Sequence, residues 1–172
     1  PTSYIPTTSS TVTRSADVAS ITGANFSSWY RQDEGTVFAQ HNSTSWNASP
    51  IFPKPFVIGT NDDNNVWIGG TTEDNQYRYR VRDGGVNQFG PANITRTSTF
   101  NNKTAIAIKA NDFAVAADGG NLATGLSGTV PIANQMAIGQ EITAENWINE
   151  PIRRLTYWPQ RLPNDILETI TQ

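Results

Sequence analysis

The sequence predicts an all-β protein, an antiparallel sandwich or jelly roll built from two sheets. Runs of about four to ten residues rich in Val, Ile, Phe, Tyr and Thr are separated by Gly, Asn and Asp, as strands are separated by turns. Before the C-terminal end, apolar residues almost never recur at the 3.6-residue spacing of a helix. So many short strands in 172 residues are typical of a single sandwich domain.

The expected strands follow one another along most of the chain. They are residues 12–21, 35–41, 55–60, 65–69, 76–82, 103–109, 112–117, 135–139 and 152–158. Two turns between them are predicted in detail: Asp83-Gly84-Gly85 supplies the positive φ angles of a tight hairpin, and Asn111-Asp112 connects two alanine-rich strands. The small alanines indicate a closely packed sheet.

The two ends of the chain differ from its middle. Residues 1–11 are mostly Pro, Thr and Ser, a composition that favours an extended connector, so we expect the sandwich domain to span 12–172. Near the other end, Pro163 can begin a helix, and the apolar residues of 162–170 recur at helical spacing. We expect a short helix that caps the sheet. Because the chain opens on Pro1, we also expect it to be a piece of a longer protein with an upstream module.

Composition excludes several classes of function. The chain has no cysteine, which removes disulfides and thiolate chemistry, and its formal net charge of -3 lacks the basic surface that nucleic-acid binding requires. No apolar stretch is long enough to span a membrane. We therefore expect neither a nucleic-acid nor a membrane partner.

Four segments carry a resemblance to a known family: 2–17, 34–39, 112–120 and 152–162, the last reading IRRLTYWPQRL. In this order and spacing they resemble the concanavalin A-like (LamG-type) lectin/glucanase domains found in tail fibre and other structural proteins of bacteriophages. The resemblance implies a two-sheet jelly roll whose last strand is followed by a short helix. Because such sandwiches host lectins, hydrolases and inert spacers alike, the function has to be argued from the site.

Tests for catalysis fail on the residues present. The Glu-x-Asp-x-x-Glu strand of glucanases with this fold is absent, since Glu145 and Glu150 have no Asp between them. His41 is the only histidine, which excludes a zinc site, and we expect it to be an ordinary loop residue. The run 125–128 lacks the final Gly of a nucleophile elbow. We predict a non-enzymatic protein without a cofactor, with calcium as the one open case.

Calcium has one candidate site. The run NDDNN at 61–65 offers oxygen ligands, and we name Asp62, Asp63 and Asn65 as the metal-binding candidates. The run lacks the Gly and the distal Glu of an EF-hand loop. The alternative is an Asx-rich hairpin turn without a metal ion.

Three tryptophans are candidates for sugar binding. A sugar needs an exposed aromatic plate beside groups that satisfy its hydroxyls, and Trp46 with Asn47 lies among small polar residues that suit such a loop. The alternatives are that Trp46 folds back onto the sandwich edge and that Trp67 lies half-buried in a strand. Trp147 is placed on a rim loop. We expect Trp46→Ala to weaken glycan binding and to leave the melting temperature unchanged.

An arginine stripe is the second candidate surface. In QYRYRVR, period-two alternation puts the two tyrosines and the valine on one face and Arg78, Arg80 and Arg82 on the other, over about 14 Å. Such a stripe suits carboxylated, sulfated or phosphorylated glycans. The alternative is a solvated face that pairs with acids on a neighbouring strand or protects a sheet edge.

The function predicted from these residues is glycan recognition. We expect a carbohydrate-binding or host-receptor-recognition domain of a phage tail fibre-like protein, located in the virion or outside the cell, with a polysaccharide or cell-surface glycan as its partner and a homotrimeric parent. A structural or trimerisation module of the virion without a ligand is the alternative. A glycan-cleaving enzyme with an unconventional pair of carboxylates is the third hypothesis.

Overall fold

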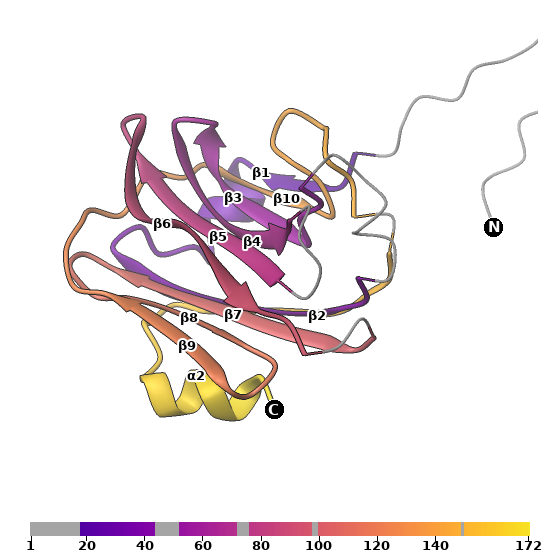
Figure 1. The fold of residues 1–172 in the computed structure, drawn as a ribbon. Coiled ribbons are helices and arrows are strands. Elements are labelled where there is room, and N and C mark those ends of the chain that lie inside the picture. Colours follow the sequence, from indigo (N-terminus) through magenta and orange to yellow (C-terminus); the bar gives the residue numbers. More distant parts are fainter. Residues whose placement is uncertain (1–17, 44–51, 72–75, 98–99, 149) are drawn as a thin grey trace, which may run out of the picture.

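The computed structural model describes residues 18–43, 52–71, 76–97, 100–148 and 150–172. It confirms the predicted fold class: two antiparallel sheets stack face to face, and a short C-terminal helix lies beneath the second sheet (Figure 1). Within these ranges, no helix has the length and apolar character needed to cross a membrane.

The first sheet has six strands in the order β1-β10-β3-β4-β5-β6. Their bounds are β1 Ser20–Thr22, β3 Phe56–Asn61, β4 Asn64–Gly70, β5 Gln76–Asp83, β6 Val86–Thr95 and β10 Gln135–Ile138. Strands β3 to β6 follow one another as hairpins, whereas β10 joins from much later in the chain and pairs with β3. A four-residue helix, α1 (Ala24–Ser27), follows β1.

The second sheet has five strands in the order β11-β2-β7-β8-β9. Their bounds are β2 Glu34–His41, β7 Asn102–Lys109, β8 Phe113–Ala117, β9 Asn121–Gly125 and β11 Ile152–Trp158. The predicted alanine-rich hairpin is β7 and β8, and the predicted last strand, β11, pairs with β2. Strands that are distant in the sequence therefore lie side by side.

The main core lies between the sheets, and β5 shows how the pattern of residues builds it. Tyr77, Tyr79 and Val81 are buried in this core, so the predicted alternation of β5 is confirmed and its arginines point outward. From the opposite sheet, Ile106 and Val115 reach the same core. Two facing apolar surfaces of this kind supply the burial that stabilises a sandwich.

A second apolar cluster covers the outer face of the five-stranded sheet. Ala105, Ala107, Ala114 and Ala116 leave this face shallow, and helix α2 (Asn164–Ile170) lies on it. Leu167 of the helix is fully buried there. The predicted C-terminal helix is thus confirmed, and it closes one of the two outer faces of the sandwich.

The two predicted turns form as expected. Gly84 and Gly85 join β5 to β6 with φ angles of 56° and 79°, the left-handed region that a tight hairpin needs. Asn111, with a φ angle of 60°, joins β7 to β8. Both turns place a residue that tolerates positive φ where the strand direction reverses.

Several elements differ from the prediction. Strand β9 was not expected, because it is short and has few β-branched residues. The predicted hairpin at Gly84-Gly85 implied a return strand, but β6 was not among the expected strands, because it contains Gly90 and Pro91. The first strand begins at Ser20, and the earlier part of its predicted range, 12–17, lies outside the described residues, as does the expected connector. The loop assignment of His41 is wrong, because His41 is fully buried at the end of β2.

Candidate functional site

The predicted arginine stripe and Trp67 lie on one surface, the outward face of β4 and β5. Trp67 is the register partner of Arg80, and the flanking pairs are Asn65 with Arg82 and Gly69 with Arg78. Paired residues of antiparallel strands project to the same side of a sheet. Since β5 lies between β4 and β6, the stripe does not protect a sheet edge.

The run 61–65 forms the hairpin turn between β3 and β4. The Asn61 side-chain oxygen accepts hydrogen bonds from the backbone N–H groups of Asp63 and Asn64, both at 3.0 Å. The Asn65 amide donates to the backbone carbonyls of Asn61 and Asp62 at 2.9 and 2.8 Å. The hydrogen bonds show an Asx-rich hairpin turn, which fixes where the two aspartates point, and they leave the calcium prediction untested.

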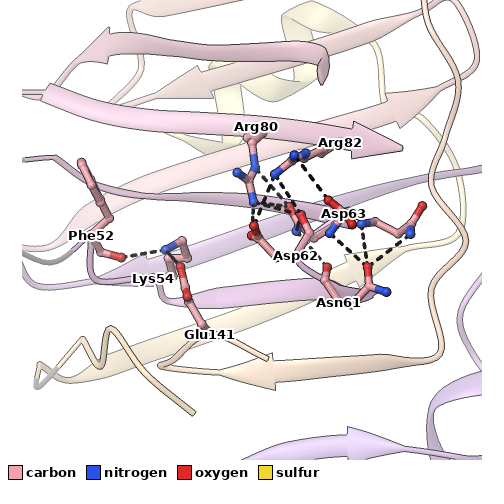
Figure 2. A network of polar contacts seen from close by, with 10 residues as sticks. Phe52, Lys54, Asn61, Asp62, Asp63, Arg80, Arg82 and Glu141 are labelled. Carbon is pink, nitrogen blue, oxygen red and sulfur yellow. Dashed lines mark hydrogen bonds and ion pairs between the residues drawn. The ribbon is translucent and has the colours of Figure 1, made fainter. Parts of the chain in front are cut away.

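The aspartates of this turn pair with the stripe. Arg80 Nη2 lies 2.6 Å from one carboxylate oxygen of Asp62, and Arg82 lies 3.3 Å from the other and 3.3 Å from Asp63 (Figure 2). The hydrogen bond from Arg80 is the main cause that lowers the pKa of Asp62. Two of the three arginines thus pair with acids in the turn of a neighbouring hairpin. Pairing with neighbouring acids was one of the alternatives for the stripe.

A calcium ion at this turn stays a prediction. The described residues contain no group of three or more His, Cys, Asp or Glu side chains arranged to hold a metal ion. A cation that took both oxygens of Asp62 would have to displace Arg80 and Arg82 from them. Backbone and amide oxygens of Asn61 and Asn65 are the further ligands that the turn offers.

Trp67 forms the floor of the site. Only 6% of its surface is exposed, because Lys54 Nζ lies 4.6 Å from the ring centroid and the Arg80 guanidinium lies 5.3 Å from it. Both distances are those of cation–π contacts, which hold a cation over the negative face of the ring. Trp67 lies in a strand, as the alternative expected, but it is buried rather than half-buried, and its ring lies beneath two cations.

Lys54 and Glu141 complete the floor and were not predicted from the sequence. The Lys54 side chain is only 2% exposed, and its ammonium donates to the carbonyl of Phe52 at 3.0 Å and pairs with the Glu141 carboxylate (Figure 2). Burial is the main cause that lowers the pKa of Lys54, and the contact with Glu141 opposes it. A cation this deeply buried needs such a partner.

Arg78 stands apart from the other two arginines. Its guanidinium lies 5.5 Å from the centre of the Phe52 ring. Within the described ranges, Arg78 makes no ion pair with a carboxylate, whereas Arg80 and Arg82 both do.

These side chains enclose a hollow of about 220 Å³ on the outward face. Its lining residues are Phe52, Lys54, Asp62, Trp67, Arg78, Arg80, Pro91 and Glu141. A smaller hollow adjoins it, shares Asp62, Trp67, Arg80 and Glu141 with it, and extends to Ile142 and Thr143. The larger of these two hollows has space for one end of a ligand.

Of the remaining predicted sugar-binding residues, Trp147 is the one that the structure describes. Trp147 lies in the loop between β10 and β11, is 38% exposed and donates from its indole nitrogen to Gln140 at 3.0 Å. It does not line the hollow, so it stays a separate candidate. Trp46 and Asn47 lie outside the described residues.

The two stacked sheets and the closing helix define the class of structure: a concanavalin A-like lectin/glucanase fold. Comparison with solved structures agrees. The Ruminococcus gnavus IT-sialidase CBM40 bound to alpha2,3 sialyllactose superimposes with a TM-score of 0.68 at 16% identity, over 83% of this chain and 84% of that chain. This confirms the lectin-type fold that the sequence resemblance implied.

Other solved structures share the fold, with comparably low sequence identity and somewhat lower TM-scores. A heptameric SAP-like pentraxin from Limulus polyphemus gives a TM-score of 0.59 at 15% identity, over 81% of this chain and 70% of that chain. Mouse laminin alpha1 domains LG4-5 give 0.57 at 10% identity, over 86% and 40%. No protein-family model and no curated protein matches the sequence.

Proposed function

We propose that this protein is a non-catalytic carbohydrate-binding module that takes an anionic glycan at the hollow on β4 and β5. The observation that carries the proposal is Arg78, a guanidinium at the rim of a hollow with no carboxylate partner in the described residues. An arginine binds a carboxylate through two parallel hydrogen bonds. The carboxylate of an acidic sugar would form this pair of hydrogen bonds with Arg78.

The rest of the lining suits the rest of a sugar. Its apolar C–H surfaces would lie against Phe52 and Pro91, and its hydroxyls can donate to the carboxylates of Asp62 and Glu141, which also line the hollow. These acids are held in place by Arg80 and Lys54, so little ordering is needed when a ligand binds.

The structural comparison supports sialylated glycans as the first ligands to test. The Ruminococcus gnavus module with the same fold was solved with sialyllactose, an acidic trisaccharide. At 16% identity this likeness concerns the fold, and the residues above carry the argument for acidity. Sialic acid presents one carboxylate beside several hydroxyls, which is the combination that the lining of the hollow offers.

The same residues argue against glycoside cleavage. A retaining or inverting hydrolase needs one carboxyl group that is protonated and acts as the acid. Asp62 is held as a carboxylate by Arg80 and its pKa is lowered, and Glu141 faces the buried ammonium of Lys54. A charged Asp62 can accept hydrogen bonds but cannot donate the proton that the acid of a hydrolase supplies.

We further infer that the module serves receptor recognition in a phage tail fibre-like protein, in the virion or outside the cell, with a trimeric parent. The support is the sequence resemblance of 34–39, 112–120 and 152–162, which the structure places in β2, in β8 with its turn, and from β11 toward α2. Light scattering of the parent fibre tests the trimer, and competition of phage adsorption by the isolated chain tests the receptor role.

Calorimetric titration with alpha2,3-sialyllactose tests the proposed binding. Wild type is expected to bind, and Arg78→Ala is expected to lose at least tenfold in affinity, the effect of one charge-assisted hydrogen-bonded contact. Arg153→Ala removes an equal charge from an exposed position on β11 of the other sheet and is the matched control. Equal affinity of Arg78→Ala and Arg153→Ala, or no binding of acidic glycans by folded wild type, would overturn the proposal.

A further inference from the structure

Glu141 lies in a loop that closes on itself above the six-stranded sheet. In residues 139–148, the N–H of Ile148 donates to the carbonyl of Gly139 at 2.8 Å, and the N–H of Ala144 donates to the carbonyl of Glu141 at 3.0 Å. The base is fixed to the sheet, because the N–H of Gly139 donates to the carbonyl of Pro55 at 2.9 Å. The loop is thus an ordered wall of the site.

The start of the loop is also held through charge, at Glu141. Glu141 forms an ion pair with Lys54, which lies just before β3. Among the described residues, the other hydrogen bonds of residues 141–146 stay within the loop. Glu141 lines both adjoining hollows and covers Lys54, whose ammonium sits over Trp67. An internal carboxylate therefore occupies a position that a ligand anion would otherwise take.

The charged side chains that line the larger hollow determine how many anionic groups a ligand can place there. The larger hollow is lined by three cations, Lys54, Arg78 and Arg80, and by two acids, Asp62 and Glu141. Three positive and two negative charges leave +1. Asp62 neutralises Arg80 and Glu141 neutralises Lys54, so one cation, Arg78, remains for the ligand.

We propose that Glu141 is a specificity-determining residue: by occupying Lys54 it restricts the hollow to glycans with a single acid group and rejects multiply sulfated or phosphorylated ones. The inference rests on the proposed anionic-glycan binding and adds its charge selectivity. A second anionic group on the ligand would meet the Glu141 carboxylate in a partly desolvated site, where like charges repel strongly. Without that carboxylate, Lys54 would receive the second group.

The test compares two ligands, alpha2,3-sialyllactose with one carboxylate and a trisulfated heparin disaccharide. Wild type is expected to prefer sialyllactose. Glu141→Gln keeps the size of the side chain and removes its charge, so we expect at least a tenfold gain in affinity for the sulfated disaccharide and no gain for sialyllactose, whose hydroxyls lose a carboxylate acceptor. Glu168→Gln on α2 makes the same change in net charge away from the hollow and is expected to alter neither affinity.

Two more variants separate charge selectivity from a general loosening of the loop. In Lys54→Met/Glu141→Gln the buried cation is gone as well, so the gain for the sulfated disaccharide should disappear although the loop has lost the same ion pair. Glu141→Asp withdraws the carboxylate from Lys54 and should give a smaller gain. It also serves as the test if Glu141→Gln does not fold.

The outcomes distinguish this inference from the proposed function. If wild type binds sialyllactose and the Glu141 variants gain nothing for the sulfated ligand, the role of Glu141 is overturned and the proposed function stands. If the gain persists in the double variant, Lys54 is not the cation involved and the inference is also overturned. Failure of wild type to bind either ligand overturns the proposed function itself.

Discussion

The outer faces of the two sheets have opposite chemistry, although both sheets share one core. On the five-stranded sheet, four alanines make a shallow surface on which α2 packs with Leu167 fully buried. On the six-stranded sheet, Trp67, three arginines and Lys54 stand on the corresponding face, and a hollow opens among them. Figure 1 shows α2 beneath the five-stranded sheet, on the side away from β4 and β5.

The difference separates what stabilises this fold from what can recognise a ligand. A sandwich needs its inner faces for stability, so each outer face is open to other uses. Small side chains let a helix approach and close one face with apolar contacts. Long charged side chains on the other face extend outward over an aromatic ring, pair with acids from neighbouring loops and leave room between them.

The largest effect on stability is expected from weakening the packing of α2 on the five-stranded sheet. Leu167→Ala should lower the free energy of unfolding by about 2–5 kcal/mol, because the side chain is fully buried and its removal leaves a cavity. Ile166→Ala, at a neighbouring position with 39% exposure, is the control and should cost much less. Denaturant unfolding measures both. Equal losses would show that α2 is not packed as described.

Acid should weaken the core before it alters the site. Burial is the main cause that lowers the pKa of His41 to about 4 from 6.5; the hydrogen bond with Asn42 opposes it and the charge of Arg96 adds to it. Between these values the unfolded chain binds a proton that the folded chain does not. The free energy of unfolding should therefore fall by about 3 kcal/mol as the pH drops from 6.5 to 4. Asp62, whose pKa is lowered, still carries its charge in this window.

Thermal unfolding at several pH values checks the His41 prediction. His41 is the only histidine, so His41→Gln should remove the slope of stability against pH between 6.5 and about 4.5, whatever its own cost at neutral pH. A slope that survives in His41→Gln would assign the acid sensitivity to other groups.

Within the charged face, Arg82 and Arg78 should behave differently. Arg82→Gln breaks ion pairs with the exposed aspartates of the turn, and exposed pairs of this kind contribute about 0–1 kcal/mol, less at high salt. Because Arg82 does not line the hollow, its loss should change sialyllactose affinity less than threefold, against at least tenfold for Arg78→Gln. Chemical denaturation and calorimetry on the two variants give the comparison. A larger binding loss at Arg82 would move the site toward the turn.

Calcium should have the smallest effect. A calcium ion at the 61–65 turn must compete with Arg80 and Arg82 for Asp62, so we expect binding no tighter than about 1 mM, the weak end for protein calcium sites. At 1 mM calcium this stabilises the fold by about 0.4 kcal/mol. Melting temperatures in calcium and in chelator measure it. A rise of several degrees would mean that the turn rearranges around the ion.

Sequence patterns over a few residues predicted the strand alternation, the turns and the short helix, because backbone geometry over a few residues determines these features. The alternation in β5 follows from the two-residue repeat of a strand, and it placed Tyr77 inside and Arg80 outside correctly. The Gly84-Gly85 turn followed from the φ angles that only glycine adopts readily. The short helix followed from the apolar spacing around Leu167.

The rest of the site depends on contacts that no local pattern records. Lys54 and Glu141 are 87 positions apart and meet because β10 pairs with β3, which brings the loop after β10 over the outward face. In the sequence, Lys54 is a lone cation between two prolines and Glu141 an ordinary loop acid. Pairing of a buried cation with a distant carboxylate becomes visible when the sheet order is known.

The most direct measurement is a titration of the isotope-labelled chain with alpha2,3-sialyllactose, followed residue by residue by NMR. We expect the largest chemical-shift changes on the Trp67 indole, on the β5 amides around Arg78 and Arg80, and on residues 141–143, and no change on α2. Changes centred on Trp147 or on α2, with the β4 and β5 signals unmoved, would contradict the claim that the open face of the six-stranded sheet binds the glycan.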